Sequence, residues 1–294
     1  MKSLPAYTFS HDAMGTTFRV TLFTEKREYA RQTVQALFEE IDRLEHELSR
    51  FYPVSDIRRI NALQAGERTR VEAGTLELLE LAQSLWHETN HVFDITINSE
   101  FKDENQALQG CDAIAVDNEQ FSVTVMREGL RLDLGGIAKG YALDQLPALL
   151  EDWGIEAALL HSGESSVMPF GLPPGKQAWD VALRHPENDT VLTSVSLANQ
   201  TISGSGSHIR GKHIIDPRTG KPAAVRPAAW AFAPAAAVSD ALSTAFMIMT
   251  VEEIEHYCRS NPDTGAIVYE VVNDTYELRH YGNQNGSSIS GKPK

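Results

Sequence analysis

Cysteine is scarce in this sequence, with only Cys111 and Cys258 among 294 residues. The two match no metal-binding spacing, and a disulfide cannot be inferred from two residues, so we expect two unpaired thiols. Long apolar runs are missing as well, and no stretch approaches the ~20 residues of a membrane span. The first ten residues hold one lysine and no apolar core segment, so we expect no signal peptide.

Positive charge is also in short supply. The chain has 26 Lys and Arg residues against 40 Asp and Glu residues, which gives a net charge of −14. This balance disfavours general binding to nucleic acid or to an anionic membrane. An anionic ligand would need a local cation or a metal to overcome the overall field.

The rest of the composition is typical of a globular protein, with 42% apolar and 22% charged residues. A chain of this length can bury ample core as one large domain or as two lobes. We expect a single domain over residues 1–294, with a tail that frays from about residue 282.

Hydrophobic periodicity predicts a mixture of strands and helices. Alternation predicts strands at 16–23, 121–126, 157–160, 179–183, 191–197, 228–233, 266–272 and 275–280. Helical spacing predicts helices over 34–48, 75–86, 239–249 and 250–259, the last with a capping box of Thr250 and Glu253. The element order is not a regular βαβ alternation, so it favours an α+β fold with largely antiparallel sheets packed with helices.

One stretch stands out near the middle of the chain. Leucines alternate with charged residues over 130–134, which predicts a half-buried strand that ends at Gly135 and Gly136. A helical pattern follows up to Gly154, with Pro147 inside it, so we expect a kink or a late helix start.

A strand, two glycines and a helix start place backbone N–H groups at the positive end of a helix dipole, where phosphate binds well. Lys139 would add a cation. A glycine pair between a strand and a helix is more often only a tight turn, so this stretch alone does not decide between the two readings.

A second pattern places Asp240 and Thr244 four residues apart at the start of an apolar helix, on one helix face. Both side chains carry hard oxygen ligands of the kind that Mg²⁺ prefers. The alternative is structural: Ser239 and Asp240 form an N-cap pair, and Thr244 bonds back to a carbonyl. Asp240 has no basic neighbour in its own helix turn. If a phosphate group binds beside it, the two negative charges repel each other, so we then expect a cation between them.

Several segments together resemble one family. They are Met14–Thr16, Leu48–Phe51 with Ser55, Asp56 and Asn61, Phe93–Thr96, Asp133–Gly140, His213–Gly220 and Ser239–Thr244. The chain resembles the ApbE family, the FAD:protein FMN transferases, over most of its length.

The resemblance implies an activity. It implies a Mg²⁺-dependent transfer of FMN from FAD to a Ser or Thr hydroxyl of an acceptor protein, with release of AMP. Two alternatives stay open: an FAD pyrophosphatase that releases FMN and AMP, and a flavin-binding protein that has lost catalysis.

The resemblance also implies a set of site residues. The metal ligands would be Asp240, Thr244 and the main-chain carbonyl of Ala138, and the catalytic residues would be His213 and Asp240. The flavin-binding residues would be Met14, Gly15, Ser49, Ser55, Asp56, Asp94, Gly135, Gly136, Lys139, Ser203, Gly204 and His213. We expect the turns at 49–61, 135–136 and 203–207 to border one pocket, with the last a glycine- and serine-rich connection.

The chain departs from the family pattern in three places. Asn90, His91 and Val92 precede Phe93 where relatives usually carry glycine, the 98–112 segment is shorter, and Ser162 replaces a glycine. If a ligand approaches that backbone closely, the bulkier residues change one wall of its pocket. Because we expect no signal peptide, the chain is expected to be cytoplasmic as it stands. Many relatives are exported, so it would be periplasmic if it has been trimmed.

Overall fold

A computed structural model describes residues 4–101, 108–186, 188–206, 215–223, 226–272, 275–282 and 288–290. The helices are α1 (Arg27–Leu48), α2 (Asp56–Ile60), α3 (Ala73–Glu88), α4 (Ala138–Asp144), α5 (Leu146–Asp152), α6 (Ala236–Ile248) and α7 (Val251–Ser260), with a 3₁₀ turn η1 (Gly110–Ala113).

The strands are numbered in chain order. They are β1 (Ala6–Ala13), β2 (Thr16–Phe23), β3 (Arg68–Arg70), β4 (Ile114–Asp117), β5 (Ser122–Val125), β6 (Ala158–Ser162), β7 (Ser166–Phe170), β8 (Trp179–Arg184), β9 (Val191–Leu197), β10 (Thr201–Gly206), β11 (Ile215–Asp216), β12 (Lys221–Pro222), β13 (Ala228–Ala233), β14 (Gly265–Val272), β15 (Thr275–Gly282) and β16 (Ser288–Ser290).

One large sheet organises the fold. Eight strands pair in the order β1-β2-β6-β7-β10-β13-β14-β15, and each recorded pairing is antiparallel. Smaller antiparallel sheets have the orders β16-β9-β8 and β3-β5-β4, and β11 pairs with β12. The expected α+β fold with antiparallel sheets is therefore confirmed.

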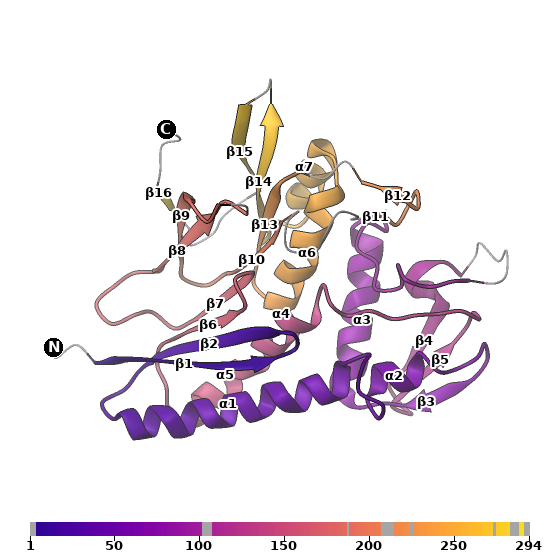
Figure 1. Cartoon of the computed structure of the whole chain (residues 1–294), viewed down its shortest axis with the longest axis horizontal. Coiled ribbons are helices and arrows are strands. Elements are labelled where there is room, and N and C mark those ends of the chain that lie inside the picture. Colours follow the sequence, from indigo (N-terminus) through magenta and orange to yellow (C-terminus); the bar gives the residue numbers. More distant parts are fainter. Residues whose placement is uncertain are drawn as a thin grey trace.

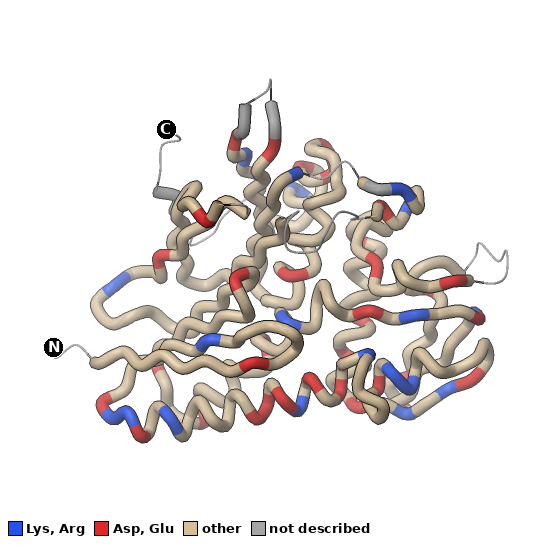
Figure 2. Tube along the Cα trace, in the orientation of Figure 1, with Lys and Arg blue, Asp and Glu red and all other residues tan. Residues whose placement is uncertain are grey.

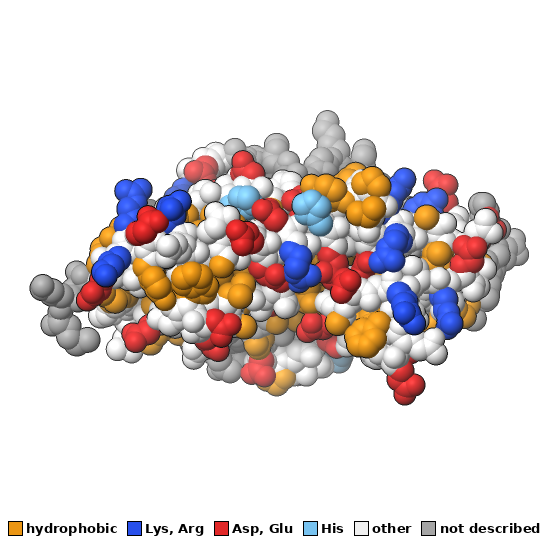
Figure 3. Space-filling view, turned by 90° about the horizontal axis from the view of Figure 1, so that it is seen from below, with side chains coloured by type: hydrophobic (Ala, Val, Ile, Leu, Met, Phe, Trp, Pro, Cys, Tyr) orange, Lys and Arg blue, Asp and Glu red, His pale blue; other side chains and the backbone are white. Residues whose placement is uncertain are grey.

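Helix α1 lies beneath β1 and β2, and α3 stands beside the small β3-β5-β4 sheet at the other end of the molecule (Figure 1). The apolar residues of α1 recur at helical spacing, so they form one buried face, which includes Val34, Leu37, Ile41 and Leu44. Acidic and basic residues both occur along the rest of α1 (Figure 2), and both signs are interspersed on the face seen from below (Figure 3).

Helix α6 is buried nearly all round because α4, β10 and β13 surround it. Ten of its thirteen residues are buried, which agrees with its apolar sequence. The helix therefore presents its few polar side chains to other parts of the protein rather than to bulk solvent.

Several sequence predictions are confirmed. The helices at 34–48 and 75–86 form as α1 and α3, and the capping box of Thr250 and Glu253 is present at α7. The helix expected after Gly136 breaks into α4 and α5 at Gln145, because Pro147 occupies the first turn of α5. No helix in the described ranges is long and apolar enough to span a bilayer.

The strand predicted at 130–134 is wrong. Its alternation is real, since Leu130, Leu132 and Leu134 are buried, but the segment joins no sheet. Side chains satisfy its backbone instead: Asn61 bonds both the N–H and the carbonyl of Leu132, at 2.7 and 3.0 Å. Periodicity reports burial, and it does not reveal whether the pairing partner is a strand or a side chain.

Two further predictions need correction. The glycine- and serine-rich stretch at 201–206 is strand β10, paired with β7 and β13, rather than a connecting turn. Within the tail that was expected to fray, residues 288–290 form β16 against β9, and residues 283–287 and 291–294 lie outside the described residues. In both places small or polar residues form regular strands because neighbouring strands supply the backbone hydrogen bonds.

Candidate active site

A cavity of about 730 Å³ lies between the large sheet and α6 on one side and the 92–98 segment on the other. The turn between β1 and β2, the start of α4, β10 and the β11 region contribute to its walls. Its lining residues are Met14, Gly15, Thr16, Val92, Phe93, Asp94, Ile95, Ile97, Asn98, Asp133, Gly135, Gly136, Lys139, Glu164, Ser165, Gly204, Ser205, Gly206, Ile215, Pro217, Asp240, Thr244, Met247 and Ile248.

Helices α4 and α6 meet at very short range beside the cavity. A Cβ atom on Gly140 would lie 2.2 Å from the carbonyl oxygen of Ala236, so a larger side chain has no room there. The absence of a side chain lets the Gly140 N–H reach Asp240 and donate to Oδ2 at 3.2 Å. This contact fixes the position of the Asp240 carboxylate relative to α4.

The start of α6 is held by a residue of α4. The Asp144 carboxylate accepts hydrogen bonds from the N–H groups of Ala236 and Ala237, at 2.7 and 2.8 Å. The N-cap position is Ala235, so the prediction that Ser239 and Asp240 cap the helix is wrong. Because the Asp144 side chain supplies the cap from another helix, no local signature marks the true start.

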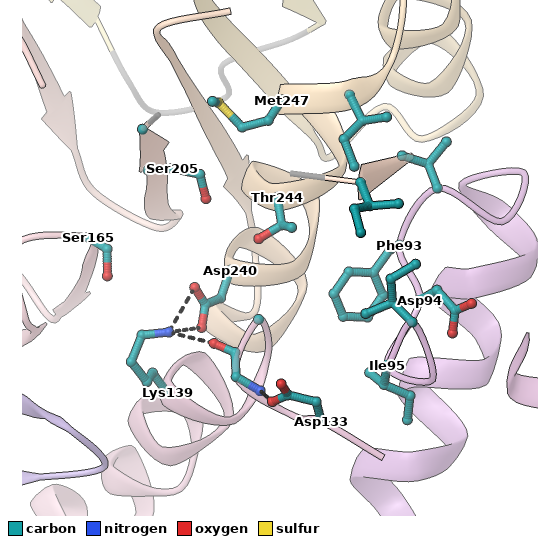
Figure 4. A pocket seen from close by; sticks show the side chains of 18 of the residues that line it. Phe93, Asp94, Ile95, Asp133, Lys139, Ser165, Ser205, Asp240, Thr244 and Met247 are labelled. Atoms are coloured by element: carbon teal, nitrogen blue, oxygen red, sulfur yellow. Dashed lines mark hydrogen bonds and ion pairs between the residues drawn. The ribbon is translucent and has the colours of Figure 1, made fainter. Parts of the chain in front are cut away.

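Lys139 joins the two helices at the cavity surface. Its Nζ lies 3.1 Å from Asp240 Oδ2 and 3.5 Å from Oδ1, and it also donates to the carbonyl of Gly135 at 3.1 Å (Figure 4). Asp240 lacks a basic neighbour in its own helix turn, but the fold brings one from α4. The Lys139 ammonium therefore balances this carboxylate without a metal, which the sequence-based prediction did not include.

Thr244 lies one helical turn beyond Asp240 and faces the same cavity (Figure 4). Its Oγ1 is buried and has no hydrogen-bond partner in the part of the chain that the structure describes. A Cβ atom on Gly136 would lie 3.6 Å from this oxygen, so the glycine turn passes within contact distance of it. A buried hydroxyl without a partner is costly unless a ligand satisfies it.

The lining of the cavity is acidic. Its described residues include four carboxylates, of Asp94, Asp133, Glu164 and Asp240, and one ammonium group, of Lys139. Asp133 also pairs with Arg50 Nη1 from outside the lining, at 3.1 Å. A pyrophosphate entering such a cavity would need additional positive charge close to it.

No group of three or more His, Cys, Asp and Glu side chains able to hold a metal occurs among the described residues. A cation here would take one carboxylate, one hydroxyl and further oxygen ligands instead, which is a set that suits Mg²⁺. The donors present fit that ion: Asp240 is 3% exposed, and the neighbouring Thr244 oxygen has no partner among the described residues.

The opposite wall is the loop that departs from the family pattern. Asn90 and His91 both have left-handed backbones, with φ of 51° and 66°, which is the conformation that glycine adopts most easily. The His91 ring stacks on Trp86 at a centroid distance of 3.8 Å, and neither Asn90 nor His91 lines the cavity. The bulkier residues therefore keep the glycine-type turn, and of the three only Val92 reaches the lining.

Asp94 closes this loop. Its Oδ1 accepts hydrogen bonds from the N–H and the hydroxyl of Thr96, both at 2.7 Å. Burial raises the pKa of this carboxyl above its ordinary value, and the bonds from Thr96 oppose that shift. In Figure 4 its carboxylate points away from Asp240 and Lys139, so the two carboxylates do not share a site.

The structure brings nine of the sequence-predicted residues to one cavity. They are Met14, Gly15, Asp94, Gly135, Gly136, Lys139, Gly204, Asp240 and Thr244. Ala138 is not among the lining residues. The main-chain carbonyl that contacts the Lys139 ammonium together with Asp240 is that of Gly135. The assignment of His213 remains a prediction, because His213 lies outside the described residues.

The predicted turn at 49–61 does not line the cavity. Ser55 caps α2 and donates to the carbonyl of Ser49, while Asp56 accepts from the Glu72 N–H at 2.7 Å and the Thr75 hydroxyl at 2.8 Å. These contacts are structural, because they cap α2 and tie the turn to the start of α3. The turn touches the site indirectly, since Arg50 pairs with Asp133.

Ser203 also lies behind the wall rather than in it. Its hydroxyl is buried against that of Ser239 on α6, at 2.8 Å. Gly204 and Ser205 line the cavity instead, and Ser205 contacts Ser243 of the same helix at 2.9 Å. Ser203 and Ser205 share one face of β10, so strand alternation alone does not tell which of them reaches the cavity.

Sequence reasoning missed several lining residues. They include Thr16, Phe93, Ser165 and Met247, and the acids Asp133 and Glu164. Phe93, Asp133 and Thr16 lie inside the matched motifs, so those motifs could have indicated them. Met247 carries no such signal, because one more apolar residue on an apolar helix is indistinguishable from core.

Comparisons with known proteins identify a family and several relatives. A sequence model of the ApbE family matches residues 14–268. An FAD:protein FMN transferase of Klebsiella pneumoniae is 27% identical over 296 aligned residues, covering 89% of this chain and 83% of that protein. One from Escherichia coli is 24% identical over 293 residues, covering 89% and 82%.

Solved structures show the same fold. The flavin transferase ApbE from Vibrio cholerae superposes with a TM-score of 0.81 at 20% identity, covering 95% of this chain and 97% of that one. The apo form of the flavinyl transferase ApbE of Pseudomonas stutzeri also gives 0.81, at 22% identity and 95% coverage of both chains. With a family match over most of its length, this chain belongs to the ApbE family.

Proposed function

We propose that the chain is an FAD:protein FMN transferase, which moves FMN from FAD to a Ser or Thr hydroxyl of an acceptor protein and releases AMP. The observation that carries the proposal is the buried Thr244 hydroxyl, which has no partner among the residues that the structure describes. It lies beside the buried Asp240 carboxylate in a cavity of about 730 Å³. The curated relatives bear the name of this activity.

Asp240 and Thr244 would hold Mg²⁺, with a carbonyl of the 135–138 turn as a further ligand. When bound, the ion would offset the charge that develops on the pyrophosphate as AMP leaves. The acidic lining supports this assignment, because a pyrophosphate between carboxylates is otherwise repelled. The Gly140 N–H keeps Asp240 in place while a ligand binds.

The cavity offers different surfaces to the two chemical parts of FAD. Phe93, Ile95 and Met247 give apolar surface suited to a flat ring system, whereas Lys139 and the Gly135–Gly136 turn give polar groups suited to phosphates. This division supports FAD as the substrate in preference to a wholly polar nucleotide.

The transfer has a simple bond balance. The acceptor hydroxyl oxygen forms a bond to the phosphorus of the FMN half, and the bond from that phosphorus to the oxygen bridging to AMP breaks. AMP leaves with the bridging oxygen, and the hydroxyl proton passes to a base. His213, outside the described residues, stays our sequence-based candidate for that base.

Incubation with FAD and Mg²⁺, with and without a library of Ser- and Thr-containing peptides, tests the proposal by mass analysis. We expect AMP in equal amount to a peptide heavier by the mass of bound FMN. Release of FMN and AMP without peptide product would favour a pyrophosphatase, and intact FAD would indicate a binding protein without catalysis. Either result would overturn the transferase assignment for the peptides tested.

A further inference from the structure

The ion pair between Lys139 and Asp240 stands where the proposed function needs a metal. The Lys139 side chain is 15% exposed and that of Asp240 is 4% exposed, so the pair is largely removed from water. The same ammonium also contacts the carbonyl of Gly135. One monovalent cation thus already bridges a carboxylate and a main-chain oxygen at the edge of the cavity.

A divalent ion cannot bind Asp240 without disturbing this pair. An ammonium about 3 Å from the carboxylate and a metal at ligand distance from the same oxygens would repel each other strongly at low solvent exposure. Lys139 can withdraw, since its long side chain starts from the first turn of α4 and faces the cavity. Asp240 is fixed by the Gly140 N–H and the packing of α6.

We propose that Lys139 is a resident counter-cation, which a divalent metal displaces from Asp240 and Gly135 and which then pairs with the pyrophosphate of the substrate. The proposal rests on the metal assignment of the proposed function. It adds that the metal binds before Lys139 pairs with the pyrophosphate. Metal binding frees the lysine, so metal and pyrophosphate bind with positive coupling. Without metal, the pair keeps Asp240 neutralised and holds the ammonium away from the phosphates.

The first test titrates Mg²⁺ alone into nucleotide-free protein and follows the heat of binding. Lys139→Met removes the competing cation, so we expect it to bind Mg²⁺ about fivefold more tightly than the wild type, or tighter still. Lys139→Gln is the second variant, in case the apolar side chain prevents folding. Lys139→Arg keeps the charge and should bind Mg²⁺ no more tightly than the wild type.

Two controls locate the effect. Lys176→Met removes a solvent-exposed lysine whose Nζ lies 3.4 Å from Asp180, and it should leave the Mg²⁺ affinity unchanged. Adding Asp240→Asn to Lys139→Met should abolish the tight binding. An affinity gain below about fivefold in both Met and Gln variants, or weaker binding, would overturn the proposal.

The second test measures the affinity for ADP, which carries the pyrophosphate but no flavin to transfer. At saturating Mg²⁺ we expect Lys139→Met to bind ADP about fivefold more weakly than the wild type, and in metal-free buffer we expect the two to bind it equally. A loss of the same size without metal would overturn the proposal, because the lysine would then serve phosphate directly. Neither test measures flavin transfer, so failure of the proposed function would be seen separately.

Discussion

The two walls of the cavity are held in different ways. The α4–α6 wall is fixed by backbone contacts: Gly140 leaves no space for a Cβ atom against Ala236, and Asp144 binds the first N–H groups of α6. The opposite wall is a loop with two left-handed residues, steadied by the stack of His91 on Trp86.

This difference indicates how much change each wall should tolerate. Charged groups that share a cation must be placed within a few tenths of an ångström, so the wall that holds Asp240 tolerates little change. The 90–97 loop offers mainly shape and apolar surface, and a left-handed turn can be built from glycine or, at some cost, from Asn90 and His91. Of the three departures, the one at Asn90, His91 and Val92 falls on this loop wall, whereas Ser162 lies in β6 of the large sheet.

The largest effect should come from filling the helix contact. Gly140→Ala places a Cβ atom against the Ala236 carbonyl, so we expect a loss of about 3 kcal/mol or more in the free energy of unfolding. Urea unfolding measures it. Gly175→Ala is the control, because its Cβ would meet open space and the left-handed backbone costs only about 1 kcal/mol. Equal losses in the two variants would contradict the close contact.

Removing the cap of α6 should have the next largest effect. Asp144→Ala leaves the Ala236 and Ala237 N–H groups without their acceptor, so we expect a loss of about 2 kcal/mol in stability. Mg²⁺ affinity should fall as well, because α6 carries Asp240. Thr250→Ala removes the cap of α7 and should cost about 1 kcal/mol without a change in Mg²⁺ affinity. If both variants leave Mg²⁺ binding intact, the position of α6 does not depend on its cap.

The same carboxyl should give a pH dependence. Burial raises the pKa of Asp144 from 3.8 to about 6, so between these values the folded chain binds more protons here than the unfolded chain. The stability that this group contributes is present at low pH and is lost as pH rises through about 6. Asp144→Asn should remove that part of the slope in thermal melts between pH 3.8 and about 6. An unchanged slope would mean that another group titrates.

The smallest effect should come from the loop wall. His91→Ala keeps the left-handed backbone and loses the ring stack, whereas His91→Gly loses the stack but relaxes the backbone. We expect the alanine variant to be less stable than the glycine variant by about 1 kcal/mol, measured by urea unfolding. The reverse order would show that the loop does not need a glycine-type turn.

Much of the fold follows from local patterns. The alternation of β2 and the helical spacing of α1 report burial directly, and the capping box of α7 is complete within four residues. The errors arise where a distant group completes the structure. Leu132 takes its hydrogen bonds from Asn61, and α6 takes its cap from Asp144, so neither is visible in a local window.

The candidate site shows the same limit. The motifs located Asp240, Thr244 and the glycine turn, because their residue types carry the chemistry themselves. They did not show that Lys139 pairs with Asp240, which lies 101 positions away in the sequence. They also placed Ser203 in the cavity, although its hydroxyl is buried against that of Ser239.

The most direct test of the Asp240 site follows FAD consumption against Mg²⁺ concentration in the wild type, Asp240→Asn and Glu164→Gln. Both substitutions remove one negative charge from the cavity, but Glu164 is 82% exposed at its side chain whereas Asp240 is buried. We predict saturable Mg²⁺ dependence in the wild type and in Glu164→Gln. In Asp240→Asn we predict that the rate falls by about a hundredfold or more. Equal Mg²⁺ dependence in all three, with Asp240→Asn folded, would contradict the account.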